Sequence, residues 1–261
     1  MSPYEWGWDA EALGLVPALS LAYLVALRRF PASRARVAAF FAGQLLILAV
    51  FLTPVETIAL RYLLTMHLLQ NVVLAEWAPA LCVAGLSPVL AARLARLPGG
   101  RILTHPFVAI SIWLAVYFAW HLPWPYDTAL RHPSSLLHVE HVSYFLAGGL
   151  VWWPVLQDAP RRLGSAAKAV YLFAAFVLAS PLGLLLALLP RPLYDVYEHA
   201  PQRLLGLSAI ADQQIAGLTM ATEQAIVFFA VFTFFFLRFL RDEEPVLRLE
   251  RATRGSTRGS V

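Results

Sequence analysis

Four histidines and one methionine have the side chains needed to hold a soft or borderline metal ion: His67, His121, His138, His141 and Met220. Neutral imidazole is a common ligand of copper, zinc and iron, and a thioether such as that of Met220 favours cuprous copper. Haem ligation is also compatible, since two histidines on facing helices are enough. These residue types therefore indicate a metal or haem site, provided that the chain brings them together.

Two acids, Glu76 and Glu223, stand in segments that otherwise carry no charge. An acid at membrane depth is costly, so each is a functional hypothesis by default and is expected to be protonated or partnered. At 100° per residue, Glu76 lies about 180° round a regular helix from His67, whereas Met220 and Glu223 share one face of their own helix. We therefore expect Glu76 to act separately from His67.

Each histidine also has a plain structural interpretation. A single histidine at a helix end, such as His121 or His138, can be an interfacial or capping residue. His105, His132 and His199 are expected to be structural or solvated. Only the convergence of four histidines on one side of the molecule favours a site.

The elements that must position these residues are apolar helices. The 261-residue chain is 59% hydrophobic and 14% charged, whereas a soluble domain carries roughly 25% charged residues. Uncharged stretches of about 17 to 25 residues can cross a bilayer as helices. We therefore predict an all-α, polytopic membrane bundle of seven transmembrane helices, near residues 12–28, 37–55, 62–90, 102–122, 135–157, 168–189 and 213–238.

The basic residues set the orientation. Sixteen of the 20 Lys and Arg residues fall in the first, third and fifth connections and the carboxyl tail. Because basic residues accumulate on the cytoplasmic side, we predict an outer amino terminus and a cytoplasmic carboxyl terminus. Residues 1–242 would form the transmembrane domain, and residues 243–261 an Arg-rich, disordered cytoplasmic tail.

With this orientation, the histidines sort by depth. His67 lies roughly 9 Å inside the outer end of its helix, at 1.5 Å per residue. His121 ends the next predicted helix at the outer side, and His138 and His141 share a face in the first turns of the one after it. The sequence therefore predicts one cluster in the outer third of the bundle. The single cysteine, Cys82, excludes an internal disulfide, and a net charge of +4 does not indicate a nucleic-acid partner.

Several motifs occur in an order that resembles a known family. The blocks are Met66-His67-Leu68-Leu69-Gln70, Ala78-Pro79, His105-Pro106, Trp120-His121-Leu122-Pro123, Glu140-His141, Trp152-Trp153-Pro154 and Asp212-Gln213-Gln214 with Met220. Together they resemble the CtaG-type cytochrome c oxidase assembly factors of bacteria, over about residues 60 to 220. The pattern departs at Asn71, where the family commonly has a second histidine, so this helix would contribute only His67.

The resemblance implies a multi-pass protein of the bacterial plasma membrane that is not an enzyme. It would bind copper transiently and deliver it to a haem–copper cytochrome c oxidase at the outer side of the membrane. The implied partners are the oxidase subunits, a copper donor protein and the lipid bilayer, with no nucleic acid.

Three other functions remain open from the residues alone. An intramembrane zinc-dependent hydrolase could use the four histidines with Asp127 or Asp212 to activate water, although no paired ligand motif such as His-x-x-x-His is present. A haem-binding electron carrier and a transporter are the other two, the latter because Glu76 and Glu223 lie near the midplane.

Overall fold

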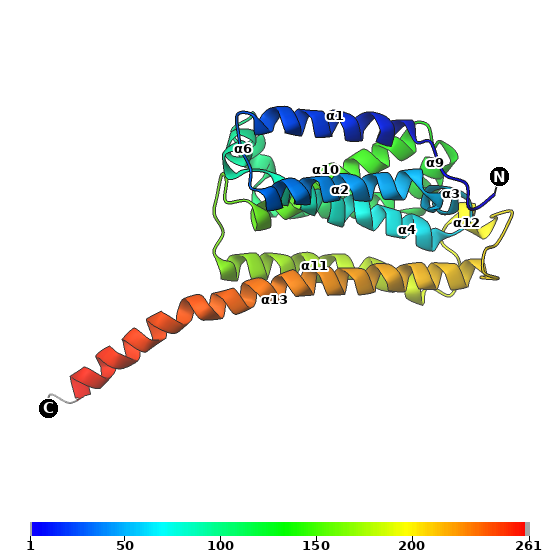
Figure 1. Cartoon of the computed structure of the whole chain (residues 1–261). Helices are drawn as coiled ribbons and strands as arrows, with labels where there is room; N and C mark the ends of the chain where they lie inside the picture. Colours follow the sequence, from blue (N-terminus) through cyan, green and yellow to red (C-terminus); the bar gives the residue numbers. More distant parts are fainter. Residues whose placement is uncertain (1, 259–261) are drawn as a thin grey trace.

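The chain folds into long helices that lie side by side, with short helices at both ends (Figure 1). This computed structural model describes residues 2–258, with side chains from residue 2 to residue 242. No strand occurs among the described residues, which agrees with the all-α prediction. The elements are α1 (Ala10–Leu27), α2 (Arg34–Leu52), α3 (Pro54–Arg61), α4 (Leu64–Val72), η1 (Val73–Trp77), α5 (Ala78–Gly85), α6 (Pro88–Leu94), α7 (Gly100–Leu103), α8 (Pro106–Trp120), α9 (Pro123–Arg131), α10 (Leu136–Leu156), α11 (Ser165–Leu188), α12 (Asp195–Glu198) and α13 (Ala209–Arg258).

Five helical segments are long and apolar enough to cross a membrane. A sixth arises if α8 and α9, bent by 71° at their junction, count as one span. The sequence predicts seven, and each predicted segment does contain a helix. The predicted segment that is not among these spans is 135–157. Its helix, α10, has 21 residues but carries Glu140 and two histidines. It packs between α8 and the α5–η1 segment, so its surface need not be apolar on every side. The five spans are Ala10–Leu27, Arg34–Leu52, Leu64–Gly85, Ser165–Leu188 and Ala209–Asp242.

The two ends of the bundle differ in what they hold. The amino terminus lies at the end that carries α3, α9 and α12, and α13 leaves the bundle at the opposite end, near α6 (Figure 1). α13 continues as a helix to Arg258, so it runs through most of the segment 243–261. The side chains of that segment are not described, and its place as a cytoplasmic tail stays a prediction.

Two helices, α4 and α12, are capped at their amino-terminal ends by carboxylates from other parts of the chain. α4 has no capping side chain at its own start. Instead, the Asp212 carboxylate of α13 accepts hydrogen bonds from the backbone amides of Leu64 (2.7 Å) and Thr65 (3.1 Å). A carboxylate at a helix start satisfies free amides and complements the helix dipole. Asp212 therefore fixes the amino-terminal end of α4 against α13.

Asp127 of α9 does the same for α12. Its two carboxylate oxygens accept from the amides of Asp195 (3.1 Å) and Val196 (3.0 Å). Arg131 of α9 also forms an ion pair with Asp195. These contacts hold the four-residue helix α12 against α9, and they determine where Tyr197 lies.

The central span is one helix with a wider turn inside it. α4, η1 and α5 follow one another without a gap from Leu64 to Gly85, and η1 is a π-helical turn. Gly148 of α10 crosses this turn so closely that a Cβ atom there would clash with the Ala75 carbonyl oxygen and lie 2.6 Å from Pro79 Cγ. Small residues at such crossings let helix backbones approach each other in membranes.

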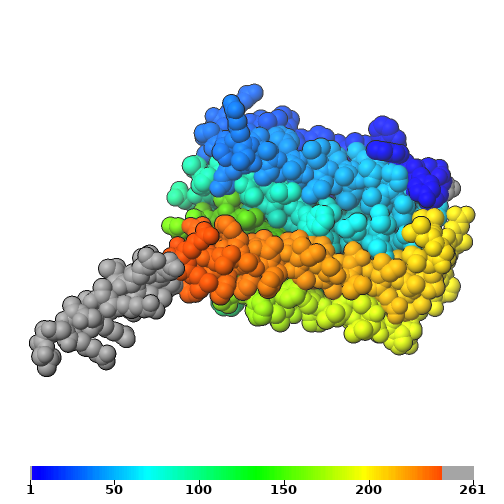
Figure 2. Space-filling model, turned by 60° about the horizontal axis from the view of Figure 1, so that its bottom comes forward, coloured from blue at the N-terminus to red at the C-terminus, as the bar shows by residue number. Residues whose placement is uncertain are grey.

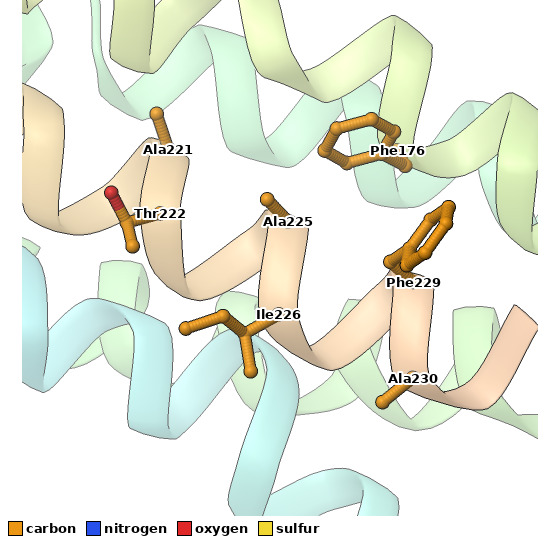
Figure 3. A pocket seen from close by; sticks show the side chains of 7 residues that line it. All are labelled: Phe176, Ala221, Thr222, Ala225, Ile226, Phe229 and Ala230. Atoms are coloured by element: carbon orange, nitrogen blue, oxygen red, sulfur yellow. The ribbon is translucent and has the colours of Figure 1, made fainter. Parts of the chain in front are cut away.

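α11 and α13 form a second close pair, which covers one face of the molecule (Figure 2). A Cβ atom on Gly217 would lie 2.6 Å from the Gly183 carbonyl oxygen. A groove runs along this pair between Phe176 of α11 and the side of α13 that bears Ala225 and Phe229 (Figure 3). Its lining has no ionisable side chain, so the chemistry must lie elsewhere.

At the end of the bundle that carries α3 and α12, the Glu56 carboxyl of α3 is drawn into the bundle. Gln70 of α4 donates to a Glu56 carboxyl oxygen and, at 3.2 Å, to the Val50 carbonyl. Burial raises the pKa of Glu56 to about 7, the hydrogen bond from Gln70 lowers it, and the nearby acids Asp9 and Glu11 add to the rise.

Gly148 gives the first test of this packing. Gly148→Ala should lower the stability of the protein in detergent by about 1–3 kcal/mol, because the added methyl group overpacks the contact with Ala75. Gly149→Ala is the matched control, since a Cβ there meets only Val83 Cγ2 at 3.9 Å. Thermal unfolding followed by circular dichroism compares the two. Equal stability of both variants would contradict the close crossing.

Glu56 gives a test that depends on pH. A pKa raised from 4.5 to about 7 means that the folded state favours the neutral carboxyl. The associated stability is present below about pH 4.5 and is lost as the pH rises through 7. Glu56→Gln should therefore raise the unfolding temperature above pH 7, by a gain of about 1–3 kcal/mol, and change little at low pH. Glu198→Gln, at an exposed site, is the control. A gain that is the same at every pH would contradict this reading.

Candidate metal centre

Three of the four predicted ligand histidines lie inside the bundle. His67 of α4, His121 at the end of α8 and His141 of α10 are 0%, 3% and 3% exposed, while His138 is partly exposed. A buried polar atom normally has a hydrogen-bond partner. The partners of each ring, and the ring nitrogens without one, therefore show what these histidines can do.

His67 presents a free lone pair. Its Nδ1 lies 2.8 Å from the Tyr197 hydroxyl, and that hydroxyl donates its own proton to the Ala59 carbonyl oxygen. Burial raises the pKa of Tyr197 well above its ordinary value, so the phenol stays neutral. Because its one proton is used, Tyr197 must accept from His67, and Nδ1 carries the ring proton. Nε2 is then left as an acceptor, and it has no hydrogen-bond partner.

His121 is locked in the same form by a different contact. Its Nδ1 lies 2.7 Å from the Tyr117 carbonyl oxygen and 3.2 Å from the Tyr144 hydroxyl. A carbonyl oxygen can only accept, so Nδ1 carries the proton here too. The buried Nε2 has no partner. Metal-binding histidines usually donate the other ring N–H to a carbonyl or a similar acceptor in this way.

The rings of His67 and His121 both lie against Tyr126, with ring centroids 5.1 Å and 6.1 Å from it. Glu140 of α10 adds an acid on the His67 side. One of its oxygens lies 3.8 Å from His67 Nε2 and accepts from Asn71 Nδ2 at 3.1 Å. Its other oxygen is buried without a partner. The core therefore combines two lone-pair nitrogens with one unsatisfied carboxyl oxygen.

Met220 lies on the His121 side of this core. A small void between the helices is lined by His121, Met220, Asn71 and Glu76, among others. The thioether and the imidazole thus face the same space. Glu76 itself lies in the wide turn Val73–Trp77, and it lines this void together with His121. Glu76 therefore faces the same space as His121, although a regular helix would place it on the side opposite His67.

Both membrane acids have partners, as the sequence predicts. Glu76 accepts from Gln224 Nε2 at 2.9 Å, and the same nitrogen lies 2.9 Å from the Tyr117 hydroxyl. Glu223 accepts from the indole N–H of Trp77. Each acid still has one buried oxygen without a hydrogen bond.

His138 and His141 belong to a separate group at the outer edge of the bundle. His138 forms an ion pair with Glu11 of α1. His141 has no hydrogen-bond partner at either ring nitrogen. Ligand atoms of Glu11, His138 and His141 all lie within 4.8 Å of one another. The structure therefore distributes the five predicted residues over two places, with His67, His121 and Met220 deeper in the bundle.

The carboxylates of Asp127 and Asp212 already accept hydrogen bonds from the backbone. Both are suggested ligands of a zinc hydrolase, but their carboxylates accept backbone amide hydrogen bonds at the starts of α12 and α4. His132 and His199 are exposed, as expected, and His105 stacks on Phe107.

Three residues of these groups are absent from the predicted set: Glu140, Glu11 and Tyr197. Glu140 has a usable signal, because it is the only acid in the 135–157 segment, as Glu76 is in its own. Glu11 and Tyr197 lie in segments remote in sequence from the histidines, and no spacing rule connects them.

The comparisons with known proteins bear on the same residues. A family model described as cytochrome c oxidase caa3 assembly factor (Caa3_CtaG) matches residues 21–242. Neither a curated protein nor a solved structure matches the chain. The matched region contains all five predicted ligands and most of the bundle, and it confirms the resemblance drawn from the motifs. The chain therefore belongs to the cytochrome c oxidase caa3 assembly factor family.

Proposed function

We propose that this protein is a non-catalytic assembly factor of the bacterial plasma membrane, which binds copper in the outer half of its bundle and passes it to a cytochrome c oxidase. Family membership supports the oxidase and the assembly role. The copper step depends on one observation, the pair of buried lone-pair nitrogens on His67 and His121.

The deeper group suits cuprous copper. Two imidazole nitrogens are sufficient for this ion, and the Met220 thioether adds a soft ligand beside His121. Nδ1 of each ring is already hydrogen-bonded, so neither ring must change its protonation to bind the ion. The other two predicted ligands, His138 and His141, lie at the outer edge, apart from His67, His121 and Met220, so they would hold a metal ion at a separate place.

The arrangement also favours release. The deeper ligands come from α4, α8 and α13, so a small movement of one helix separates them. The void beside His121 and Met220 is narrow, so a bound ion must displace side chains slightly. Such a site holds copper as cargo and not as a permanent cofactor.

We propose that the helices in all seven predicted segments cross the membrane, with the amino terminus outside. Three observations support this topology. Lys and Arg are unevenly distributed between the connections. The amino terminus lies at one end of the bundle, and α13 leaves it at the other (Figure 1). The helix α10 has 21 residues, which is long enough to cross a bilayer. An odd number of crossings places the two ends on opposite sides.

The partners in this proposal are oxidase subunits, which receive copper, and a donor protein, which supplies it. The family match gives no support to the zinc hydrolase. The capping roles of Asp127 and Asp212 remove the acids that such an enzyme would use.

The topology can be tested by labelling single cysteines in intact cells. Leu97→Cys and Ser134→Cys replace exposed residues in the 91–101 and 122–134 connections. A Cys82→Ser background removes the native thiol, which is buried. An impermeant maleimide should label residue 134 and not residue 97, while both should react after the cells are opened. Labelling of residue 97 from outside would refute the orientation.

The copper site can be tested on purified protein in detergent under reducing conditions. His67→Ala and His121→Ala should each weaken cuprous ion binding by at least the roughly 10- to 100-fold that loss of a ligand's hydrogen-bond partner costs, measured by competition with a chromogenic chelator. The oxidase of cells that carry each variant should contain less copper.

His105→Ala, which removes a histidine stacked on Phe107 far from the core, is the matched control. Circular dichroism verifies that each variant is folded. Unchanged cuprous binding together with normal oxidase copper in both core variants would exclude copper delivery through these residues and leave a scaffolding role.

A further inference from the structure

The group at the outer edge has its own chemistry, which the deeper histidines do not explain. Glu11 comes from the first turn of α1, and His138 and His141 come from the first two turns of α10. Their carboxylate and imidazole atoms lie within 4.8 Å of one another. No other group of three or more His, Cys, Asp or Glu residues with this proximity occurs in the described part of the chain.

His141 is the residue that points to a ligand. It is 3% exposed, yet both of its ring nitrogens lack a hydrogen-bond partner. Its ring stands edge-on to Phe51, with centroids 4.9 Å apart, and this contact satisfies neither nitrogen. Burial of a polar group without a partner is unfavourable, because the group loses its hydrogen bonds to water and gains none in return. A bound cation at one of the nitrogens would offset this cost.

The backbone holds the three side chains in place. His138 and His141 are three residues apart on one helix, so they project from the same face. Glu11 lies two residues after Asp9, whose side chain caps α1 by accepting a hydrogen bond from the amide of Ala12 at 2.7 Å. This cap fixes the turn of α1 from which Glu11 projects. A mostly apolar pocket between α1, α2 and α10 adjoins the group, and Glu11 and His141 are the ionisable side chains in its lining.

We propose that Glu11, His138 and His141 form a second metal site, for a divalent transition-metal cation such as Cu²⁺ or Zn²⁺. One carboxylate and two imidazoles are borderline ligands that suit these ions, and the carboxylate balances part of the charge. The deeper group, which contains Met220, is softer. The two sites therefore select different ions or oxidation states.

A purely structural interpretation competes with this one. The Glu11–His138 ion pair could act only as a latch that holds α1 against α10. The latch needs two residues, whereas the metal site also needs His141, so the His141 variant separates the two interpretations.

The role of this site in oxidase assembly rests on the proposed function, but binding of the divalent ion does not. The test therefore uses Cu²⁺ or Zn²⁺ alone, titrated into the full-length protein in detergent under oxidising conditions. Chelator competition gives the affinity, and electron paramagnetic resonance of the Cu²⁺ complex counts the coordinating nitrogens. The variants are Glu11→Gln, His138→Ala and His141→Ala. His132→Ala, which removes an exposed histidine at the same end, is the matched control.

We expect one site whose Cu²⁺ spectrum shows two nitrogens. Glu11→Gln should weaken Cu²⁺ binding by at least the roughly 10- to 100-fold that loss of a ligand's hydrogen-bond partner costs, and each of the two histidine variants should remove one nitrogen. His132→Ala and His67→Ala should leave the spectrum unchanged. Because His138 and Glu11 are not fully buried, their variants should fold even if His141→Ala does not, and they test the site without it.

Cu²⁺ and Zn²⁺ affinities that do not change in Glu11→Gln and His138→Ala would overturn the proposal. So would a well-folded His141→Ala protein whose Cu²⁺ spectrum still shows both nitrogens, because the ion would then be held by other residues. Wild-type protein that binds neither Cu²⁺ nor Zn²⁺ would overturn the proposal in favour of the latch. The effect of His67→Ala and His121→Ala on cuprous binding is measured separately. If both variants bind the cuprous ion normally and the divalent site is nevertheless found, the copper-delivery function is wrong and the divalent site stands.

Discussion

The position of the candidate centre depends on one capping interaction, the contact between the Asp212 carboxylate and the first amides of α4. Inside an apolar bundle, free backbone amides have no water to satisfy them, and α4 has no cap of its own. Asp212 therefore ties the start of α4 to α13. This contact determines how deep His67 lies and how Met220, two turns further along α13, faces the same core. Asp127 has the same effect on α12, which carries Tyr197.

The polar core shows a division between satisfied and unsatisfied atoms. Backbone ends are capped, and Nδ1 of His67 and of His121 is bonded. The buried atoms without partners include Nε2 of both rings, one oxygen of Glu140 and both nitrogens of His141, and also groups with no proposed role, such as the indole N–H of Trp113 and of Trp152. The Nε2 atoms of His67 and His121 differ from those groups because a hydrogen bond at Nδ1 fixes each of them as a lone-pair donor, which a metal ion can satisfy.

Much of this organisation could be predicted from the sequence, because charge-free segments of membrane length are a strong signal. Residue order was sufficient to predict the seven helical segments, the presence of partners for Glu76 and Glu223, and the family. The number of clear spans did not, because α10 packs among other helices and can carry Glu140 and its histidines. The separation of His141 from His121 could not be predicted either, since helical spacing describes one helix and says nothing about its neighbours. Tyr197 and Glu11 reach the histidines only through tertiary packing.

The π-helical turn at Val73–Trp77 has a consequence for how this chain tolerates insertions and deletions. Such a turn contains one residue more than a regular helix needs, and each residue advances the helix by about 100°. Deleting one residue there would restore regular winding and rotate everything after it relative to α4. Pro79 would lose its contact with Gly148, and Cys82 would lose the hydrogen bond that its sulfur accepts from Gln44 at 3.2 Å. The extra residue thus sets the rotational register between the half of the span that carries His67 and the half that packs against α2 and α10.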